Sequence, residues 1–449
     1  MIRRIVLLGL LLVAAFSCQE SVAPFVFEAR IVDGQNGNPA AGTDATALRI
    51  GIQEAELPAQ EYQYPITDGD FEAVLEFGVF TRPTRIRVEI AGETTELLSA
   101  SPAFVPTASA GLLRVVTAAP SSCERVTFDL LEAPRAFFAM VRSGTFALIA
   151  GGTASSDEQI EFFDLLEWES RLFAEDLSVT DLGETRAASI DEAEILVLPS
   201  NAEPFIFNML DPSRRIAPVD LHSGAGPRSA LVSVAGVGAM VIGGELGGEA
   251  RSEVSLVAPG GEVVSLRLSK PRSGPAATAL GANVLVVGGD PDGDAELLLD
   301  GSATGQPVGG VMDGVREGGL LVGDGESRAL LLGGTDAEDA VRQDSLRFDG
   351  CPSACASGAG PDWTTARLGV LNPSDSALLV GGESSSMVEE VRWNDGNVEI
   401  QALLQMEFPR AGAGALVLGS GAFVVAGGDD GVSIRDDFEF CVPAALQPL

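Results

Sequence analysis

The sequence predicts an all-β protein in which one four-stranded antiparallel unit is repeated seven times. The first observation is a phrase of apolar residues followed by two glycines, such as ALLLGGT from Ala329 to Thr335, which recurs along the chain. Its copies lie about 45 residues apart, a period typical of a solenoid or a propeller. The second observation is that no apolar pattern with a helical period interrupts the copies. The glycine pairs begin at Gly151, Gly243, Gly288, Gly333, Gly381 and Gly427.

The gap between Gly151 and Gly243 spans two periods and holds a seventh copy, ILVLPSN, from Ile195 to Asn201. Each apolar run alternates too little to be half-exposed, so we expect a strand that is buried on both faces. A glycine pair at its end indicates positive φ or the close approach of another backbone. More amphipathic strands are expected after the pairs, at 158–168, 344–350 and 389–395. We therefore expect the same crowded corner to recur in every unit.

The units resemble the kelch repeat, whose pattern is Pro-Arg, an apolar strand, a glycine pair, an aromatic-Asp pair and a Trp. The first unit carries Pro134-Arg135, Gly151-Gly152, Phe163-Asp164 and Trp168, and the fifth carries Arg316, Gly333-Gly334, Phe348-Asp349 and Trp363. The second unit lacks the glycine pair and most units lack the Trp. The resemblance implies a seven-bladed kelch-like β-propeller over residues 124–442.

The last unit is one strand short, because only one strand, Val432 to Phe440, follows its glycine pair. We expect Arg125 to Leu131 to complete it as the outer strand, since an unpaired sheet edge promotes aggregation. Cys123 and Cys441 would then be neighbours on an antiparallel pair and within disulfide range. Cys351 and Cys355 are close enough in sequence to pair locally, which leaves Cys18 over. A metal site at the second pair is disfavoured because no histidine is nearby.

The first residues predict export. Residues 1–17 combine two arginines with an apolar run too short to span a bilayer, which indicates a signal peptide. The end of this segment resembles a bacterial lipobox, which implies lipidation of Cys18, although Ala15 and Phe16 depart from the pattern and also suit an ordinary signal peptidase. We predict an outer-membrane or surface lipoprotein; the alternative is a periplasmic or secreted protein.

The remaining segments complete the expected organisation. Residues 18–23 form a lipidated tether, 119–123 a linker and 443–449 a tail. Residues 24–118 lack glycine pairs and alternate strand-like runs with polar Gly/Asn/Pro turns. This segment resembles a small Ig-like or carboxypeptidase-regulatory-like β-sandwich.

Composition excludes several functions. The 28 basic and 64 acidic residues give a formal net charge of −36, which repels nucleic acid. The one histidine, His222, has no catalytic motif around it, and both tyrosines, Tyr62 and Tyr64, precede the repeats. A copper site of the galactose-oxidase type needs two tyrosines and two histidines, and a sialidase-type site needs a tyrosine nucleophile. Neither site can therefore form in the repeats. We predict no cofactor, but sequence alone does not exclude a pair of catalytic carboxylates.

Two sets of residues are candidates for binding. An arginine precedes the position of the glycine pair in every unit, and the kelch resemblance implies that such residues lie near the mouth of a central channel, where they could hold a carboxylate or phosphate. The alternative is that each pairs with a carboxylate of the protein. Asp290, Asp292 and Asp294 have the one-three-five spacing of a calcium loop, but lack its glycine and its final glutamate. The arginines are Arg135, Arg186, Arg228, Arg272, Arg316, Arg367 and Arg410.

The leading functional hypothesis is a lipid-anchored envelope protein whose propeller binds a protein or glycan without catalysis. The alternative is a hydrolase or lyase that acts on an envelope polysaccharide through carboxylates at the channel mouth. A purely structural envelope component is the third possibility.

Overall fold

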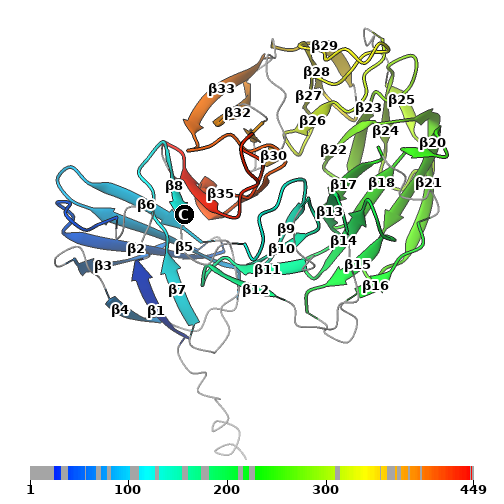
Figure 1. Ribbon diagram of the computed structural model, residues 1–449. Helices are drawn as coiled ribbons and strands as arrows, with labels where there is room; N and C mark the ends of the chain where they lie inside the picture. Colours follow the sequence, from blue (N-terminus) through cyan, green and yellow to red (C-terminus); the bar gives the residue numbers. More distant parts are fainter. Residues whose placement is uncertain are drawn as a thin grey trace, which may run out of the picture.

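The computed structural model is all-β, as predicted (Figure 1). Within the described residues there is no α-helix, and one 3-10 turn spans Gly419–Gly421. No described helix has the length and apolar character needed to cross a membrane. The structure describes residues 25–31, 39–55, 57–66, 72–77, 82–101, 111–126, 131–153, 160–172, 182–210, 216–221, 228–308, 314–353, 355–361, 370–371, 376–382, 385–394, 397–444 and 446.

Two sheets form the N-terminal part. One has the strand order β3 (Gln60–Pro65), β2 (Ala47–Glu54), β5 (Thr84–Ala91), β6 (Glu96–Ala100). The other has the order β4 (Glu72–Phe77), β1 (Phe25–Ile31), β7 (Gly111–Val115), with β1 and β7 parallel. Leu48, Ile50 and Ile90 of the first sheet share one apolar core with Leu113 and Val115 of the second. Alternation of buried and exposed residues along β5 fits a strand with one face on this core.

In the described part of the chain seven further sheets follow, and in the first six the strands are ordered largely as they occur in the chain. Sheets 1 to 3 are β9 (Ala139–Ser143), β10 (Phe146–Ala150), β11 (Ile160–Asp164), β12 (Glu169–Leu172); β13 (Thr185–Ser189), β14 (Glu194–Pro199), β15 (Phe205–Asn208), β16 (Ile216–Pro218); and β17 (Ala230–Val234), β18 (Gly238–Ile242), β20 (Glu249–Val257), β21 (Val263–Arg272), with β19 (Glu245–Leu246) beside β20.

Sheets 4 to 7 repeat this arrangement. They are β22 (Ala276–Leu280), β23 (Asn283–Val287), β24 (Ala295–Leu298), β25 (Gln306–Val308); β26 (Leu320–Gly323), β27 (Ala329–Leu332), β28 (Ser345–Asp349), β29 (Ala356–Ala359); β30 (Val370–Leu371), β31 (Ser376–Val380), β32 (Met387–Asn394), β33 (Asn397–Gln405); and β34 (Gly414–Val417), β35 (Phe423–Ala426), β36 (Phe438–Val442), β8 (Ser122–Val126).

The sheets form a propeller-like ring with their first strands innermost (Figure 1). The inner strand β9 contacts β13, β13 contacts β17, β17 contacts β22 and β22 contacts β26, while β34 contacts both β30 and β9. Each pair of neighbouring sheets shares an apolar cluster. The second strands are buried along both faces, because each lies between the clusters of two neighbours.

The glycine pairs lie where one sheet meets the next. Gly289 donates its N–H to the carbonyl of Arg316 in the following sheet at 2.7 Å, and Gly428 donates to Arg135 at the same distance. Both glycines of each described pair have positive φ. A Cβ atom on Gly427 would lie 2.6 Å from the Arg135 oxygen, so the junction has no room for a side chain. This confirms the expected crowded corner.

The chain ends close the ring, with different strand limits from those expected. β8 pairs antiparallel with β36, and Cys123 is opposite Cys441 in a disulfide with a Cα–Cα distance of 4.0 Å. β8 begins at Ser122, so it includes the end of the expected linker, and β36 begins only at Phe438. The earlier start predicted for β36 is wrong because Asp430 accepts hydrogen bonds from the N–H groups of Val432 and Ser433 and holds a turn there.

The N-terminal sheets pack against the closure of the ring. Leu98 and Ala100 of β6 belong to the apolar cluster that joins sheets 7 and 1. Gly419 donates its N–H to the carbonyl of Ser101 at 2.8 Å, and Arg114 donates its N–H to the carbonyl of Leu166 at 2.9 Å. The two parts are therefore in contact through both apolar burial and backbone hydrogen bonds. The second predicted disulfide, Cys351–Cys355, is also present.

Candidate functional site

Four of the seven candidate arginines occupy one repeated position and are fully buried. The exposed fraction is 0% for Arg135, Arg272 and Arg410 and 1% for Arg316. Each guanidinium donates through NH1 to the carbonyl of the first glycine of its own sheet, at 3.0, 2.6, 2.7 and 3.0 Å respectively. The backbone carbonyl of the same arginine accepts a hydrogen bond from the second glycine of the preceding sheet. The arginine therefore connects two sheets, one through its side chain and one through its backbone.

A carboxylate on the third strand neutralises three of these arginines. Glu161, Glu296 and Glu439 lie at the same register position, opposite the residue two places before the glycine pair. Arg135 donates Nε to Glu161 at 2.9 Å, and both side chains are 0% exposed. In sheet 5 this position is Leu346, and Arg316 pairs instead with Asp344. Buried charges require such partners.

Sheet 2 carries an apolar pair at the two corresponding positions. Leu182 occupies the position in sheet 2 that Arg135 occupies in sheet 1. Each stands four residues before the inner-strand residue that pairs with the end of the second strand, Ala139 with Ala150 in sheet 1 and Arg186 with Leu198 in sheet 2. Phe205 takes the glutamate's place on β15. Leu182 and Phe205 are buried in the same apolar cluster. The Arg–Glu pair is thus replaced as a unit, as expected if either charge alone would be costly to bury.

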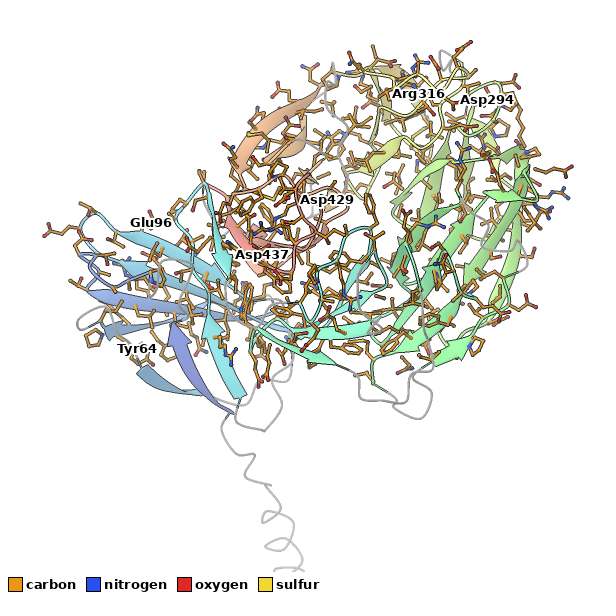
Figure 2. All side chains as sticks on the ribbon, in the orientation of Figure 1. Tyr64, Glu96, Asp294, Arg316, Asp429 and Asp437 are labelled. Carbon is orange, nitrogen blue, oxygen red and sulfur yellow. A yellow bond between two sulfur atoms is a disulfide. The ribbon has the colours of Figure 1, made fainter. Side chains whose placement is uncertain are left out.

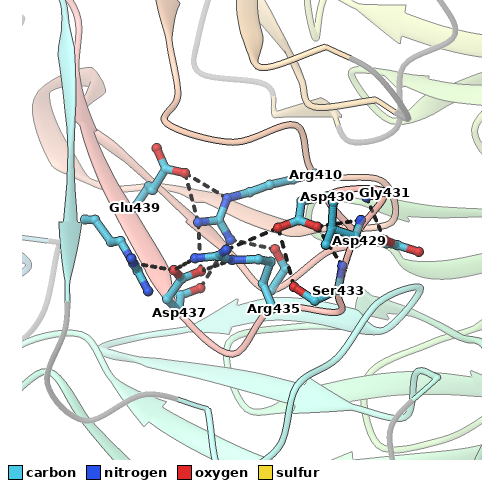
Figure 3. Close-up of polar contacts among 11 residues, drawn as sticks. Arg410, Asp429, Asp430, Gly431, Ser433, Arg435, Asp437 and Glu439 are labelled. Atoms are coloured by element: carbon cyan, nitrogen blue, oxygen red, sulfur yellow. Dashed lines mark hydrogen bonds and ion pairs between the residues drawn. The ribbon is translucent and has the colours of Figure 1, made fainter.

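Sheet 7 has the largest of these ionic clusters (Figure 3). Arg410 donates to Asp437 and Glu439, each at 2.8 Å, and Asp437 also pairs with Arg435 and with Arg125 of β8. Burial acts to raise the pKa of Asp437, but hydrogen bonds and charge from Arg435 and Arg410 outweigh it, so this pKa lies below its ordinary value. The cluster therefore joins the first strand of the ring to the last ionically, beside the disulfide.

The hypothesis of a ligand-binding ring of seven arginines is wrong for these four residues. Their guanidinium groups are enclosed by protein and already hydrogen-bonded, so no ligand can reach them. The alternative, pairing with carboxylates of the protein, is what the structure contains.

The other three candidates do not share that position. Arg228 stands where sheet 4 has Gly274, adopts a positive φ of 65°, and pairs with Glu245 and Glu317. Arg186 lies on β13 and donates to the carbonyl and the hydroxyl of Ser229. Arg367 lies outside the described residues.

The aspartates of the possible calcium loop converge, but on a lysine. Oxygen atoms of Asp290, Asp292 and Asp294 lie within 4.8 Å of one another. The Nζ atom of Lys270 is 2.8 Å from Asp292 and 3.8 Å from Asp290, and it also pairs with Asp294. Arg272 takes the other oxygen of Asp290 at 2.8 Å. Since an ammonium group already stands among the carboxylates, the calcium hypothesis loses its support.

The residues considered for catalysis from the sequence are placed as follows. Tyr62 and Tyr64 lie on β3 in the N-terminal sheets, and Figure 2 shows Tyr64 apart from the ring. His222 and Cys18 fall outside the described part of the chain. The carboxylates that the repeat places at equivalent positions, Glu161, Glu296 and Glu439, are at most 1% exposed and paired with arginine.

A comparison with family models finds no match, and neither does a comparison with curated proteins. Among solved structures, the one titled "Structure of YjhT" is similar to 69% of this chain and 95% of its own chain, at 11% identity and a TM-score of 0.41. This likeness carries no argument about function. The two disulfides point to an oxidising, extracytoplasmic environment.

Proposed function

We propose that residues 124–442 form a seven-bladed kelch-like propeller that acts as a non-catalytic binding platform in the cell envelope. Residues 24–118 form a β-sandwich packed on it, and a lipid on Cys18 anchors the chain in the outer membrane or at the surface. The observation that carries the proposal is a set of exposed aliphatic side chains on one face of the ring.

These side chains lie in the loops that follow the glycine pairs. Leu246 is 53% exposed, Val341 69% and Val432 94%. All three lie between the second and third strands of their sheets, so they project from the same end of the ring. Loops that a rigid scaffold holds in place often carry binding residues, and we infer from these three exposed side chains that this end of the ring binds another protein.

The burial of the repeat's carboxylates argues against the glycan hydrolase or lyase. A glycosidase needs two carboxylates that reach the substrate. Glu161, Glu296 and Glu439 serve instead as buried partners of arginine. Their role is to hold the ring together.

The test compares capture of envelope proteins by immobilised wild-type protein and by the triple variant Leu246→Asp, Val341→Asp, Val432→Asp. The matched control carries Leu57→Asp and Leu210→Asp, which are 47% and 77% exposed; Leu57 lies in the N-terminal sheets and Leu210 lies between the third and fourth strands of sheet 2. A partner captured by the wild type and the control, but not by the triple variant, supports the proposal. Equal capture by all three contradicts it, and so does turnover of envelope glycans.

The anchor has its own test. Mass spectrometry of the mature protein should find a diacylated cysteine at its N-terminus, and Cys18→Ala should release the protein from the membrane fraction. An unmodified mature N-terminus at another residue would refute the anchor and leave the binding proposal standing.

A further inference from the structure

The inner strands of the ring carry positive charge only. Within their described bounds β9, β13, β17, β22, β26, β30 and β34 contain no Asp or Glu, although the chain has 64 acidic residues. Their charged residues are Arg142 and Arg186, each with part of its side chain exposed to solvent and part covered by protein. We propose that the axis of the ring binds a small oxyanion ligand, a carboxylate or phosphate, through Arg186 at one end and Arg142 with Arg85 at the other.

Arg186 is the long side chain at a position where most sheets have a small one. The residue that pairs with the last residue before the glycine pair is Ala139 in sheet 1, Ala230 in sheet 3, Ala276 in sheet 4 and Gly414 in sheet 7. In sheet 2 it is Arg186, opposite Leu198. Ala139, Ala276 and Gly414 are buried, whereas Arg186 is exposed, so only in sheet 2 does this position present a charged group to solvent among the sheets compared.

The contacts of Arg186 orient it and leave it without a counter-charge. NH2 donates to the Ser229 hydroxyl at 3.1 Å and NH1 to the Ser229 carbonyl. No carboxylate among the described residues pairs with it, and burial lowers the pKa of its guanidinium. An arginine has five N–H donors, so several remain for an anion. A partly desolvated cation with unused donors favours an oxyanion as its partner.

Arg142 lies three residues further along its strand than the position equivalent to Arg186, roughly 10 Å away at the usual strand rise. It donates to the Val417 carbonyl at 3.3 Å. Burial lowers the pKa of Arg142, and the nearby charge of Arg85 lowers it further. Arg85 comes from β5, so this end combines the N-terminal sheets with the ring. In the described residues neither arginine has an ion pair with a carboxylate.

Two cationic ends separated in this way suit a ligand with two separated anionic groups better than a ligand with one such group. A dicarboxylate or a phosphorylated acid can contact both ends, whereas acetate or inorganic phosphate reaches one. Arginine recognises both groups through the same forked geometry. The site is independent of the exposed loop residues on which the proposed function rests, because it includes none of Leu246, Val341 and Val432.

The experiment is isothermal titration of the full exported chain at low ionic strength with acetate, inorganic phosphate and a series of α,ω-dicarboxylates of increasing length. We expect phosphate to bind more tightly than acetate and one dicarboxylate length to bind most tightly. Arg186→Met and Arg142→Met should each weaken that binding about tenfold, the usual effect of losing a charge-assisted hydrogen bond. Arg392→Met removes an exposed ion pair on β32 and is the matched control.

Circular dichroism and thermal unfolding of each variant establish that it is folded. Equal binding by the wild type and both inner-strand variants would overturn the proposal, as would equal loss in Arg392→Met, because the effect would then reflect net charge. If both arginine variants bind as the control does while the loop triple variant loses its partner, the site fails and the proposed function stands. If phosphate binds but no dicarboxylate length is preferred, the two ends do not act together and the proposed site is refuted.

Discussion

Replacing Arg135 with leucine should destabilise the ring strongly, and replacing Glu161 with phenylalanine in the same chain should recover part of the loss. The two side chains are 0% exposed and joined at 2.9 Å. Without the arginine, Glu161 keeps hydrogen bonds from Ser170 at 2.8 Å and the Glu132 N–H at 3.1 Å within the described residues, and the Gly151 carbonyl loses the Arg135 donor. Breaking a buried ion pair from one side costs about 3–5 kcal/mol.

The double variant Arg135→Leu, Glu161→Phe copies Leu182 and Phe205 of sheet 2, where the apolar pair is buried in the same cluster. Replacing a buried ion pair with apolar residues of similar volume is often neutral. The remaining cost comes from the unpaired polar groups, about 1–3 kcal/mol for each one buried. We therefore expect the double variant to be more stable than the single variant by about 2 kcal/mol.

The assay is urea unfolding followed by circular dichroism, with the free energy of unfolding compared among the wild type, both single variants and the double variant. Arg392→Leu breaks an ion pair whose arginine is 49% exposed and serves as the control. An exposed pair contributes about 0–1 kcal/mol, so this change should be small. If Arg135→Leu costs no more than the control, or if the double variant is as unstable as the sum of the singles, the reasoning is refuted.

Three further predictions concern the closure, a sheet junction and pH. Replacing Cys123 and Cys441 together with serine should lower the free energy of unfolding by about 6 kcal/mol in the chain-entropy treatment, because the disulfide closes a separation of 318 residues; equal urea midpoints for oxidised wild type and variant would contradict this. Gly427→Ala, whose Cβ would lie 2.6 Å from a carbonyl, should lower the melting temperature more than Gly281→Ala, which has the same sign of φ and nothing within 4 Å; equal losses would mean that φ alone matters. Hydrogen bonds from Thr residues lower the pKa of Asp44 to about 2, so its contribution to stability is present above its ordinary pKa and is lost as pH falls through 2; urea midpoints of wild type and Asp44→Asn should converge over that range, and a constant difference would count against the assignment.

The repeat could be predicted from the sequence because its cause is local and recurs. An apolar run buried on both faces and a glycine pair at a crowded junction are needed in nearly every sheet, so the pattern appears along the chain. The closure through Cys123 and Cys441 could be predicted because the last unit lacks an outer strand and the strand before the first unit has no other partner. The limits of β36 could not, since a side-chain turn at Asp430 replaces several of the expected strand residues.

The role of the arginines shows where a sequence reading stops. The buried ones stand 16 or 17 residues before the glycine they bind. Arg228 stands 15 residues before Gly243, and Arg186 stands 13 before Pro199, which takes the glycine's place. That signal was present but had no meaning without the strand register, which places Glu161 and its counterparts against the guanidinium groups. The ion pair between Lys270 and Asp292 could likewise not be predicted from the sequence, because the two residues lie in neighbouring sheets.

By itself the sequence determined the all-β class, the repeated unit and the pairing of the cysteines, because each depends on patterns within one unit or on the chemistry of a few residues. Only the tertiary structure decided which charged side chains are enclosed and which meet solvent. Burial of a charge depends on what the neighbouring sheet places around it, and that neighbour is set by register and packing rather than by distance along the chain. Hence Arg135 is enclosed with Glu161 between two sheets, whereas Arg186, only one sheet further along the chain, meets solvent.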